Sequence, residues 1–223
     1  MVPLLSVELH CHSLFSPDSP NKIDDLILMA ERKGIDRLAI TDHNTISGAR
    51  EAKKMAPERI IVGEEIRTQK GELLAYFVQE EIPKGLPPLE AIRLLREQDA
   101  FISVSHPFDI GRENWPEADL MEIVSLIDAI EIFNSRCFYP LANRRAQQFA
   151  ARQGLPGTVG SDAHLLSEIG RSRMRVCPFS NKTEFKMVIR EAKVETAMSE
   201  FWVHWGSWWA RMVKELSWQK PPP

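Results

Sequence analysis

Cysteine is scarce in this sequence. The 223 residues contain only Cys11, Cys137 and Cys177, and no two of them form a Cys-x-x-Cys pair. An odd number of widely spaced cysteines excludes a disulfide-stapled miniprotein and favours a reducing compartment. No apolar run approaches the roughly 18 residues that a membrane span needs, and we expect no signal peptide before the first polar motif. The sequence therefore predicts a cytoplasmic protein.

An excess of either sign of charge is also lacking. The chain has 28 Lys and Arg against 31 Asp and Glu, which gives a formal net charge of -3. This balance provides no global field to attract polyanions, so we expect no nucleic-acid partner by default. Hydrophobic residues make up 43% and charged residues 26% of the chain. These ordinary values exclude a disordered or fibrous protein.

The glycine-rich loops of nucleotide-binding folds are absent, because neither Gly-x-Gly-x-x-Gly nor the P-loop pattern occurs. Instead, strand-like apolar runs alternate with segments of helical periodicity. We predict strands at 4–9, 37–41, 59–62, 73–78, 101–104, 129–133, 157–159 and 173–176. We predict helices at 23–33, 47–55, 89–97, 120–126, 141–153 and 184–193. Such alternation builds parallel sheet, and about seven units over about 190 residues favour a distorted (β/α) barrel over an open doubly wound sheet.

Five of the six histidines lie in short polar clusters that follow predicted strands. The clusters are His10-Cys11-His12, Thr41-Asp42-His43, Ser105-His106-Pro107 and Ser161-Asp162-Ala163-His164, and Glu64-Glu65 adds carboxylates after another strand. In a parallel barrel the C-terminal strand ends converge on one face, so these residues are expected to meet. Imidazoles and carboxylates without thiolates suit Zn, Mn or Fe in hydrolytic chemistry.

Each cluster also has a simpler structural interpretation. His106-Pro107 can form a strand-end turn, and Thr41-Asp42-His43 can cap the helix that follows. The coincidence of five histidines at strand ends favours a shared site. His10 and His12 are two residues apart, so their side chains share one face while Cys11 points away. The sixth histidine, His204, lies among tryptophans and is interpreted as structural.

Seven motifs occur in a fixed order along residues 5–195. They are V-E-L-H-C-H-S, S-P-D-S, A-I-T-D-H-N-T, I-V-G-E-E-I, S-H-P-F-D, I-E-I-F-N-S-R and G-S-D-A-H. In this order they resemble the PHP superfamily, named for polymerase and histidinol phosphatase, and especially its small stand-alone metal-dependent phosphoesterases. The resemblance implies an α/β fold, a distorted (β/α)7 TIM-like barrel over residues 1–195. A C-terminal Trp-rich amphipathic helix and Pro-rich tail, residues 196–223, are expected to pack on the same domain.

The resemblance also implies two or three divalent metals per chain, with Mn, Zn, Fe and Mg as candidates. The first metal would take His10, His12, Glu65 and Asp162. A second would share Glu65 and add His106, and a third would use Asp18, His43 and His164. Many members carry a histidine where this sequence has Glu72, so the second metal either takes Glu72 as an oxygen ligand or is weak or absent. Glu65 is chosen over Glu64 on the family pattern Gly-x-Glu-Ile.

The implied activity is hydrolysis of phosphate esters by a metal-bound water, with no side-chain nucleophile. Guanidinium groups match phosphate oxygens, so we predict Arg136 and Arg171 as phosphate clamps and Asn134 as a residue that orients substrate or caps a helix. The predicted substrate is a small phosphorylated molecule, such as a sugar, amino-alcohol or nucleotide monophosphate. The alternatives are a 3′ exonuclease and a PHP module whose metal cluster is structural or regulatory.

Five of the six tryptophans fall between residues 202 and 218. On a helix over 201–216 an apolar stripe forms from Trp202, Trp205, Trp209, Met212, Val213 and Leu216. We expect this helix to dock on the barrel or at a homodimer interface. Peripheral membrane contact is the second interpretation, because Trp favours headgroup depth, but the helix is only weakly basic. A stacking platform for single-stranded nucleic acid is less favoured for the same reason.

Overall fold

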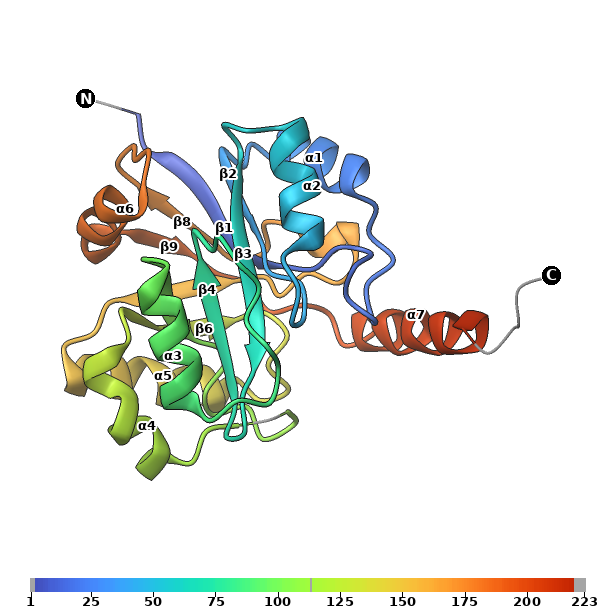
Figure 1. Cartoon of the computed structure of the whole chain (residues 1–223). Coiled ribbons are helices and arrows are strands. Elements are labelled where there is room, and N and C mark those ends of the chain that lie inside the picture. The colour runs from blue at the N-terminus through green and yellow to red at the C-terminus, as the bar shows by residue number, and fades with distance from the viewer. Residues whose placement is uncertain (1–2, 113, 219–223) are drawn as a thin grey trace.

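Strands and helices alternate along most of the chain in a computed structural model that describes residues 3–112 and 114–218, without the side chains of 216–218. The strands are β1 (Leu5–Cys11), β2 (Arg37–Ile40), β3 (Ile60–Arg67), β4 (Glu72–Tyr76), β5 (Phe101–Val104), β6 (Ala129–Asn134), β7 (Gly157–Gly160), β8 (Arg173–Val176) and β9 (Lys193–Glu195). The helices are α1 (Ile23–Arg32), α2 (Ser47–Met55), α3 (Pro88–Glu97), α4 (Glu117–Ile123), α5 (Pro140–Gln153), α6 (Lys182–Val188) and α7 (Val203–Trp218) (Figure 1). The predicted helices and strands are present with shifted ends, and β9 is an addition.

The nine strands form one sheet in the order β7-β6-β5-β4-β3-β2-β1-β8-β9. The pairs β1–β2, β2–β3, β5–β6 and β6–β7 are parallel, as the alternation predicts. Strand β4 is antiparallel to both β3 and β5, because a short turn joins it directly to β3 without a helix. Strict βα alternation is therefore wrong at β4, and the barrel is distorted there. It also fails after β7, because β8 follows without an intervening α-helix and pairs antiparallel with β1 and β9.

The sheet curls until β1 and the end of β7 meet. The main-chain N–H of His12 donates to the carbonyl of Ala163 at 2.9 Å, and the N–H of Ala163 donates to the carbonyl of His10 at 3.2 Å. The other half of β1, from Leu5 to Val7, pairs with β8 instead. The seven strands β1–β7 thus form a nearly closed TIM-like barrel whose seam closes only at the C-terminal strand ends.

Apolar side chains fill the barrel interior at its other end and the layer beneath the helices. The interior cluster takes one or more residues from every barrel strand and from α6: Val7, Leu9, Ala39, Ile61, Leu74, Tyr76, Phe101, Ala129, Val159 and Phe185. A second cluster lies under α3 and α5, and a third under α1 and α2. Because apolar side chains fill one end of the barrel, the polar residues at the C-terminal strand ends gather at the opposite end, which is the barrel mouth.

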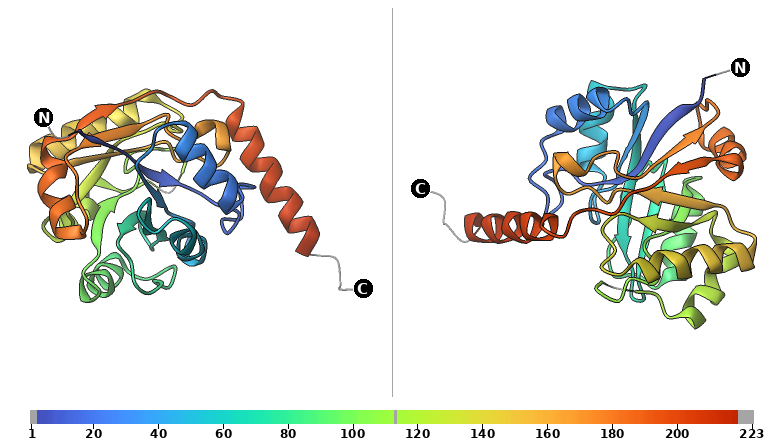
Figure 2. Two further views of the ribbon diagram at one scale, coloured as in Figure 1. Left: turned by 90° about the horizontal axis from the view of Figure 1, so that it is seen from above. Right: turned by 180° about the vertical axis from the view of Figure 1, so that it is seen from behind.

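Helix α7 leaves the body at one edge (Figures 1 and 2). Hydrogen bonds from two basic side chains, Arg136 of the barrel and Lys214 of the helix, tie it to the barrel. The Arg136 guanidinium donates to the Ser207 hydroxyl at 2.7 Å, and the Lys214 ammonium donates to the carbonyls of Leu14, Ser16 and Ser19. Among the described residues, no helix is long and apolar enough to span a bilayer.

Candidate metal centre

The end of β1 delivers two imidazoles to the barrel mouth. The pairing register of β1 shifts between Glu8 and Cys11, and His10 and His12 are both fully buried in the mouth. Cys11 lies instead in the apolar cluster beneath α1 and α2, where its thiol donates to the carbonyl of Ala39 at 3.3 Å. The sequence interpretation that separates this thiol from the histidines therefore agrees with its position.

Two carboxylates face these imidazoles. His12 Nε2 lies 3.2 Å from Asp162 Oδ1 and 3.4 Å from Glu65 Oε2. His10 Nε2 lies 3.5 Å from Asp162 Oδ1 and 3.4 Å from Glu65 Oε1. All four side chains are fully buried, although they come from β1, β3 and the loop after β7. The residues implied for a first metal are thus neighbours in the fold.

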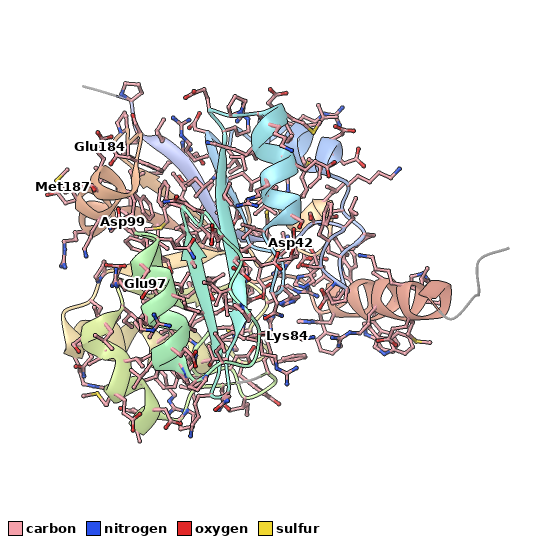
Figure 3. All side chains as sticks on the ribbon, viewed as in Figure 1. Asp42, Lys84, Glu97, Asp99, Glu184 and Met187 are labelled. Carbon is pink, nitrogen blue, oxygen red and sulfur yellow. The ribbon has the colours of Figure 1, made fainter. Side chains whose placement is uncertain are left out.

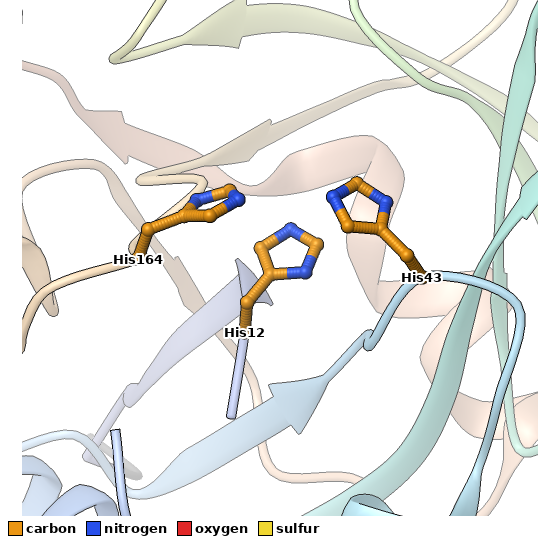
Figure 4. A group of neighbouring side chains, drawn as sticks. All are labelled: His12, His43 and His164. Carbon is orange, nitrogen blue, oxygen red and sulfur yellow. The ribbon is translucent and has the colours of Figure 1, made fainter. Parts of the chain in front are cut away.

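A second group gathers around Asp18. Its carboxylate lies 3.5 Å from His43 Nε2 and 3.3 Å from His164 Nε2. The rings of His43 and His164 lie on either side of His12, with centroids 4.5 and 4.2 Å from its own (Figure 4). The turn that holds Asp18 therefore contributes to the same cluster of imidazoles and carboxylates as the strand ends. This cluster at the barrel mouth is called the basin below.

Glu72 also belongs to the basin. It begins β4, and its carboxylate lies 3.5 Å from His106 Nε2, while Glu65 Oε1 lies 3.2 Å from the same nitrogen. Burial, together with the nearby Glu65 carboxylate, raises the pKa of Glu72. A cation held between Glu65, Glu72 and His106 would relieve that repulsion, so the acidic residue fits a ligand role.

Neighbouring acceptors fix the orientation of three rings through their Nδ1 atoms. His10 Nδ1 lies 2.8 Å from Glu131 Oε1, and His164 Nδ1 lies 2.9 Å from the carbonyl of Asp162. His12 Nδ1 lies 3.0 Å from the Ser16 hydroxyl, which itself donates to a carboxylate oxygen of Asp42 at 2.7 Å. Metal-binding histidines typically use such contacts to hold Nδ1–H and present Nε2.

Several buried polar atoms in the basin lack a hydrogen-bond partner among the described residues. They are the Nε2 atoms of His10 and His12, the Oδ1 atoms of Asp18 and Asp162, Glu65 Oε2 and His106 Nδ1. An unpaired buried polar atom is costly, and five of these six face the basin with lone pairs that a cation can use. The donor set is imidazole and carboxylate only. The residues present therefore fit divalent metal ions.

The charge states of these groups also suit cation binding. Burial opposes ionisation of Asp162, but the Arg112 guanidinium and His10 outweigh it and hold the pKa of Asp162 well below its usual range. His10 and His43 similarly hold the pKa of Glu65 well below normal, against its burial. Burial, with His164 and His43 nearby, lowers the pKa of His12 to about 3. At neutral pH the site thus offers the ionised carboxylates of Asp162 and Glu65 and a neutral His12 imidazole. Burial opposes protonation of His10 and His43, but the neighbouring carboxylates raise the pKa of both rings well above normal, so a metal that binds there would displace protons.

Backbone geometry shows how tightly the mouth is built. A side chain at Gly160 would place its Cβ 2.3 Å from the Cβ of His10, so only glycine fits beside this imidazole. His106 and Asp162 adopt φ values of 21° and 53°, in a region that non-glycine residues seldom occupy. Strain of this kind persists where the surrounding structure holds a functional side chain in place.

A cavity of about 340 Å³ opens above the basin, and it is strongly cationic on one side. Its lining includes Asp18, His43, Glu72 and His164 from the basin together with Arg67, Arg112, Arg136, His204, Ser207 and Arg211. The Arg112 guanidinium contacts Asp162 Oδ2 and lies 3.6 Å from Asp109. Sequence reasoning did not select Arg112, whose only signal is its place in the loop after His106.

The structure shows the surroundings of three residues that the sequence analysis singled out. Arg171 lies outside the cavity, because its guanidinium binds the carbonyl of Met198 and the carboxylate of Glu200. Asn134 is fully buried and donates to Glu131 and to the candidate ligand Asp162. It does not cap α5, because Tyr139 is the N-cap residue of that helix. His204 lines the cavity, with its ring stacked on Phe138 at 4.5 Å between centroids.

The other candidate clamp, Arg136, does line the cavity, but its guanidinium is almost fully buried against α7. It therefore joins the helix to the cavity wall. Asp42 does not cap α2, which begins at Ser47. It accepts from Ser13 and Ser16 and so supports His12. Glu131 was also missed, although it stands in the I-E-I-F-N-S-R motif and is recognisable only by its contact with His10.

Comparison with known proteins places this geometry in context. A family model described as PHP-associated matches residues 140–194. The uncharacterized protein MJ0417 of Methanocaldococcus jannaschii is 34% identical over 175 residues, which cover 77% of this chain and 70% of that protein.

Solved structures show the same fold at low sequence identity. PsfC from Pseudomonas syringae superposes with a TM-score of 0.66 at 15% identity, over 96% of this chain and 99% of its own. A Bifidobacterium adolescentis protein assigned as a metal-dependent phosphoesterase gives 0.61 at 18% identity, over 74% and 90%. The lesion-specific endonuclease PfuEndoQ from Pyrococcus furiosus gives 0.63 at 17% identity, over 86% and 57%.

Proposed function

The chain belongs to the PHP superfamily, and from this premise we propose that it is a metal-dependent phosphoesterase acting on a small phosphorylated substrate. The observation that supports the proposal is the stacking of two charge layers at the barrel mouth. Nine imidazole and carboxylate side chains, with Asp18 and His106 among them, form the lower layer, and arginines line the cavity above them. Such an arrangement suits a phosphate held between cations from both sides.

The lower layer would hold two or three divalent ions, of which Mn, Zn and Fe match the mixed nitrogen and oxygen donors best, with Mg as a further candidate. His10, His12, Glu65 and Asp162 would hold one, His106, Glu65 and Glu72 a second, and Asp18, His43 and His164 a third. Bound ions would supply Lewis-acid stabilisation of phosphoryl oxygens and activation of a water nucleophile.

The chain's own residues would position the substrate. Burial opposes the charge on Arg112, but the Asp162 carboxylate outweighs it and raises the pKa of Arg112, so this guanidinium stays charged while facing the cavity. Burial, with Arg136 and Arg112 nearby, lowers the pKa of His204 to about 4, so this imidazole is neutral at pH 7. A neutral His204 and the Ser207 hydroxyl can hydrogen-bond polar groups of the substrate beyond the phosphate.

Cavity size favours a small substrate. The 340 Å³ available lies at the lower end of the range for small-molecule pockets, about 300–1,000 Å³. The balanced charge of the chain agrees with this interpretation, because it offers no global attraction to a polyanion.

The proposal is tested with a substrate panel. Protein stripped with chelator and reloaded separately with Mn, Zn, Fe or Mg is assayed against phosphorylated sugars, amino-alcohols and nucleotides, and against phosphodiesters. We expect metal-dependent release of inorganic phosphate from at least one small monoester. Inactivity across the panel, in protein shown by elemental analysis to hold metal, would contradict the enzyme assignment and favour a structural or regulatory cluster.

Arg112→Gln tests the phosphate contact separately. Hydrogen bonds to charged groups contribute about 1.5–3 kcal/mol, so we expect kcat/KM to fall about 10- to 150-fold, with partial recovery in Arg112→Lys. Arg171→Gln, whose guanidinium lies outside the cavity, is the matched control and should stay near wild type. Metal content measured in each variant separates this effect from a disturbed Asp162. A change of less than twofold in Arg112→Gln would exclude this arginine as a phosphate ligand.

A nuclease is the second candidate, on one specific observation. A further cavity of about 610 Å³ shares Arg67 with the first and is also lined by Lys70 and Lys84. These cations could follow a phosphodiester backbone away from the mouth. Cleavage of a labelled oligonucleotide that weakens steeply with salt, in preference to the small monoesters, would favour this alternative.

We also propose the cytoplasm as the compartment. The three cysteines are unpaired, with Cys11 and Cys137 buried and Cys177 exposed. An exposed free thiol is better tolerated where glutathione and thioredoxin keep thiols reduced.

A further inference from the structure

The two faces of α7 have different surroundings. Val203 and Ala210 are buried against the body, and His204, Ser207 and Arg211 line the substrate cavity. The opposite face carries Trp205, Trp208 and Trp209, and Trp202 lies just before the helix; the exposed fractions of these four tryptophans run from 53% to 66%. The helix therefore presents its small and polar residues to its own domain and its largest apolar residues outward.

This outward face is large enough to be an interface. A fully buried aromatic side chain covers about 150–250 Å², so four tryptophans about 60% exposed leave roughly 600 Å² of accessible surface. Phe201, Met212 and Val213 add to it. Two such faces brought together would bury about 1,200 Å², which reaches the range of stable protein interfaces. Monomeric proteins seldom expose an apolar patch of this extent without using it.

The spacing of the exposed residues matches helix–helix packing. Trp202, Trp205, Trp209 and Met212 follow one another at intervals of three, four and three residues, which is the a/d spacing of a coiled-coil seam. Two identical helices can pack along such a seam about a two-fold axis, because each offers the same face to the other.

The charges beside the seam argue against a lipid surface. Arg211 and Glu215 lie on α7, and Glu200 just before it, all exposed, while the Lys214 ammonium is bound to three carbonyls of the body. Among the described residues of this segment, one exposed cation against two anions gives no attraction to anionic headgroups, which interfacial helices obtain from a cationic face. Charges of both signs can instead pair across a symmetric helix contact.

We propose that the tryptophan face of α7 binds the same face of a second copy of this chain and forms a symmetric homodimer. Because the other face of α7 contributes His204, Ser207 and Arg211 to the cavity, the dimer holds one wall of the candidate active site in place. The interface itself does not depend on the proposed catalytic activity.

The experiment compares the mass of the full chain in solution with that of a Trp205→Ser/Trp209→Ser variant by sedimentation equilibrium at micromolar concentration. Wild type is expected at twice its 25.5 kDa chain mass and the variant at 25.5 kDa. Both substitutions are at exposed positions, and circular dichroism checks that the variant is folded. The matched control is Met187→Ser on α6, an equally exposed residue (64%) at the far end of the body from α7, which should remain dimeric (Figure 3).

Three results would overturn the proposal. If the wild-type chain is monomeric across micromolar concentrations, no homodimer forms and the proposal is wrong. If the double variant remains dimeric, the dimer interface does not include Trp205 and Trp209. Cosedimentation of monomeric wild type, but not of the double variant, with phosphatidylcholine vesicles, with or without phosphatidylglycerol, would assign the tryptophans to a lipid surface instead. None of these readouts uses turnover, so the dimer and the phosphoesterase can fail independently.

Discussion

Glu65→Gln is expected to lower kcat/KM about 1,000-fold, if the chain is the phosphoesterase proposed. Glu65 touches every part of the basin, because its two oxygens lie within 3.4 Å of nitrogens of His10, His12, His43 and His106. An amide has one acceptor oxygen and no charge, so it cannot bridge two cations. Loss of several kcal/mol of transition-state stabilisation by metal corresponds to a factor of about 10³ in rate.

Glu64→Gln provides the matched control, because it is the same substitution one residue earlier in β3. Strand alternation points Glu64 out of the basin, where its carboxylate accepts from the Ile82 N–H at 3.1 Å. This variant should keep near wild-type kcat/KM and metal content, whereas Glu65→Gln should lose bound metal in elemental analysis. Equal loss in both variants would mean that misfolding, and not ligand chemistry, explains the Glu65 result.

The same Glu64→Gln variant should change how stability depends on pH. Burial raises the pKa of Glu64 to about 8; the Ile82 hydrogen bond opposes this shift and the nearby Glu81 adds to it. Between the unfolded value of 4.5 and about 8, the folded chain keeps a proton that the unfolded chain releases. The free energy of unfolding therefore falls as pH rises through this window, by an amount on the order of 5 kcal/mol at about 1.4 kcal/mol per unit.

Glutamine cannot ionise, so Glu64→Gln should remove this loss. We expect the variant to match wild type within about 1 kcal/mol near pH 4.5 and to exceed it by a few kcal/mol at pH 9, measured by urea unfolding of metal-free protein. Glu122→Gln, at an exposed position of α4, is the control and should follow the wild-type curve. Parallel curves for wild type and Glu64→Gln would show that Glu64 titrates near its unfolded pKa.

Sequence reasoning selected the candidate ligands because their signals are local. A histidine pair at a strand end, or an Asp-x-His after an apolar run, is visible within a few letters, and parallel topology then implies that the strand ends meet. Glu72 and Asp18 were the exceptions, because both were considered only through family resemblance. Asp18 looks like a turn residue. Its contacts with His43 and His164 arise from a loop whose path the sequence does not specify.

The surroundings of the ligands could not be found this way. Glu131 orients His10 across 121 residues of sequence, and Arg112 meets Asp162 across 50. Arg136 and Arg171 both follow polar strand-end segments, yet one lines the cavity and the other binds Glu200. No local pattern distinguishes them, because the direction of a long side chain depends on which acceptors surround it.

The sequence by itself determined the alternation of strands and helices, the set of imidazole and carboxylate donors, and the existence of an apolar stripe on the terminal helix. Each of these features depends on periodicity or residue type within one segment. The tertiary structure decided that β4 runs antiparallel, that Glu72 joins the basin and that His204 lines the cavity. It also decided that Trp205, Trp208 and Trp209 face away from their own domain. These features depend on contacts between distant segments, which residue pattern constrains only through the packing of the whole chain.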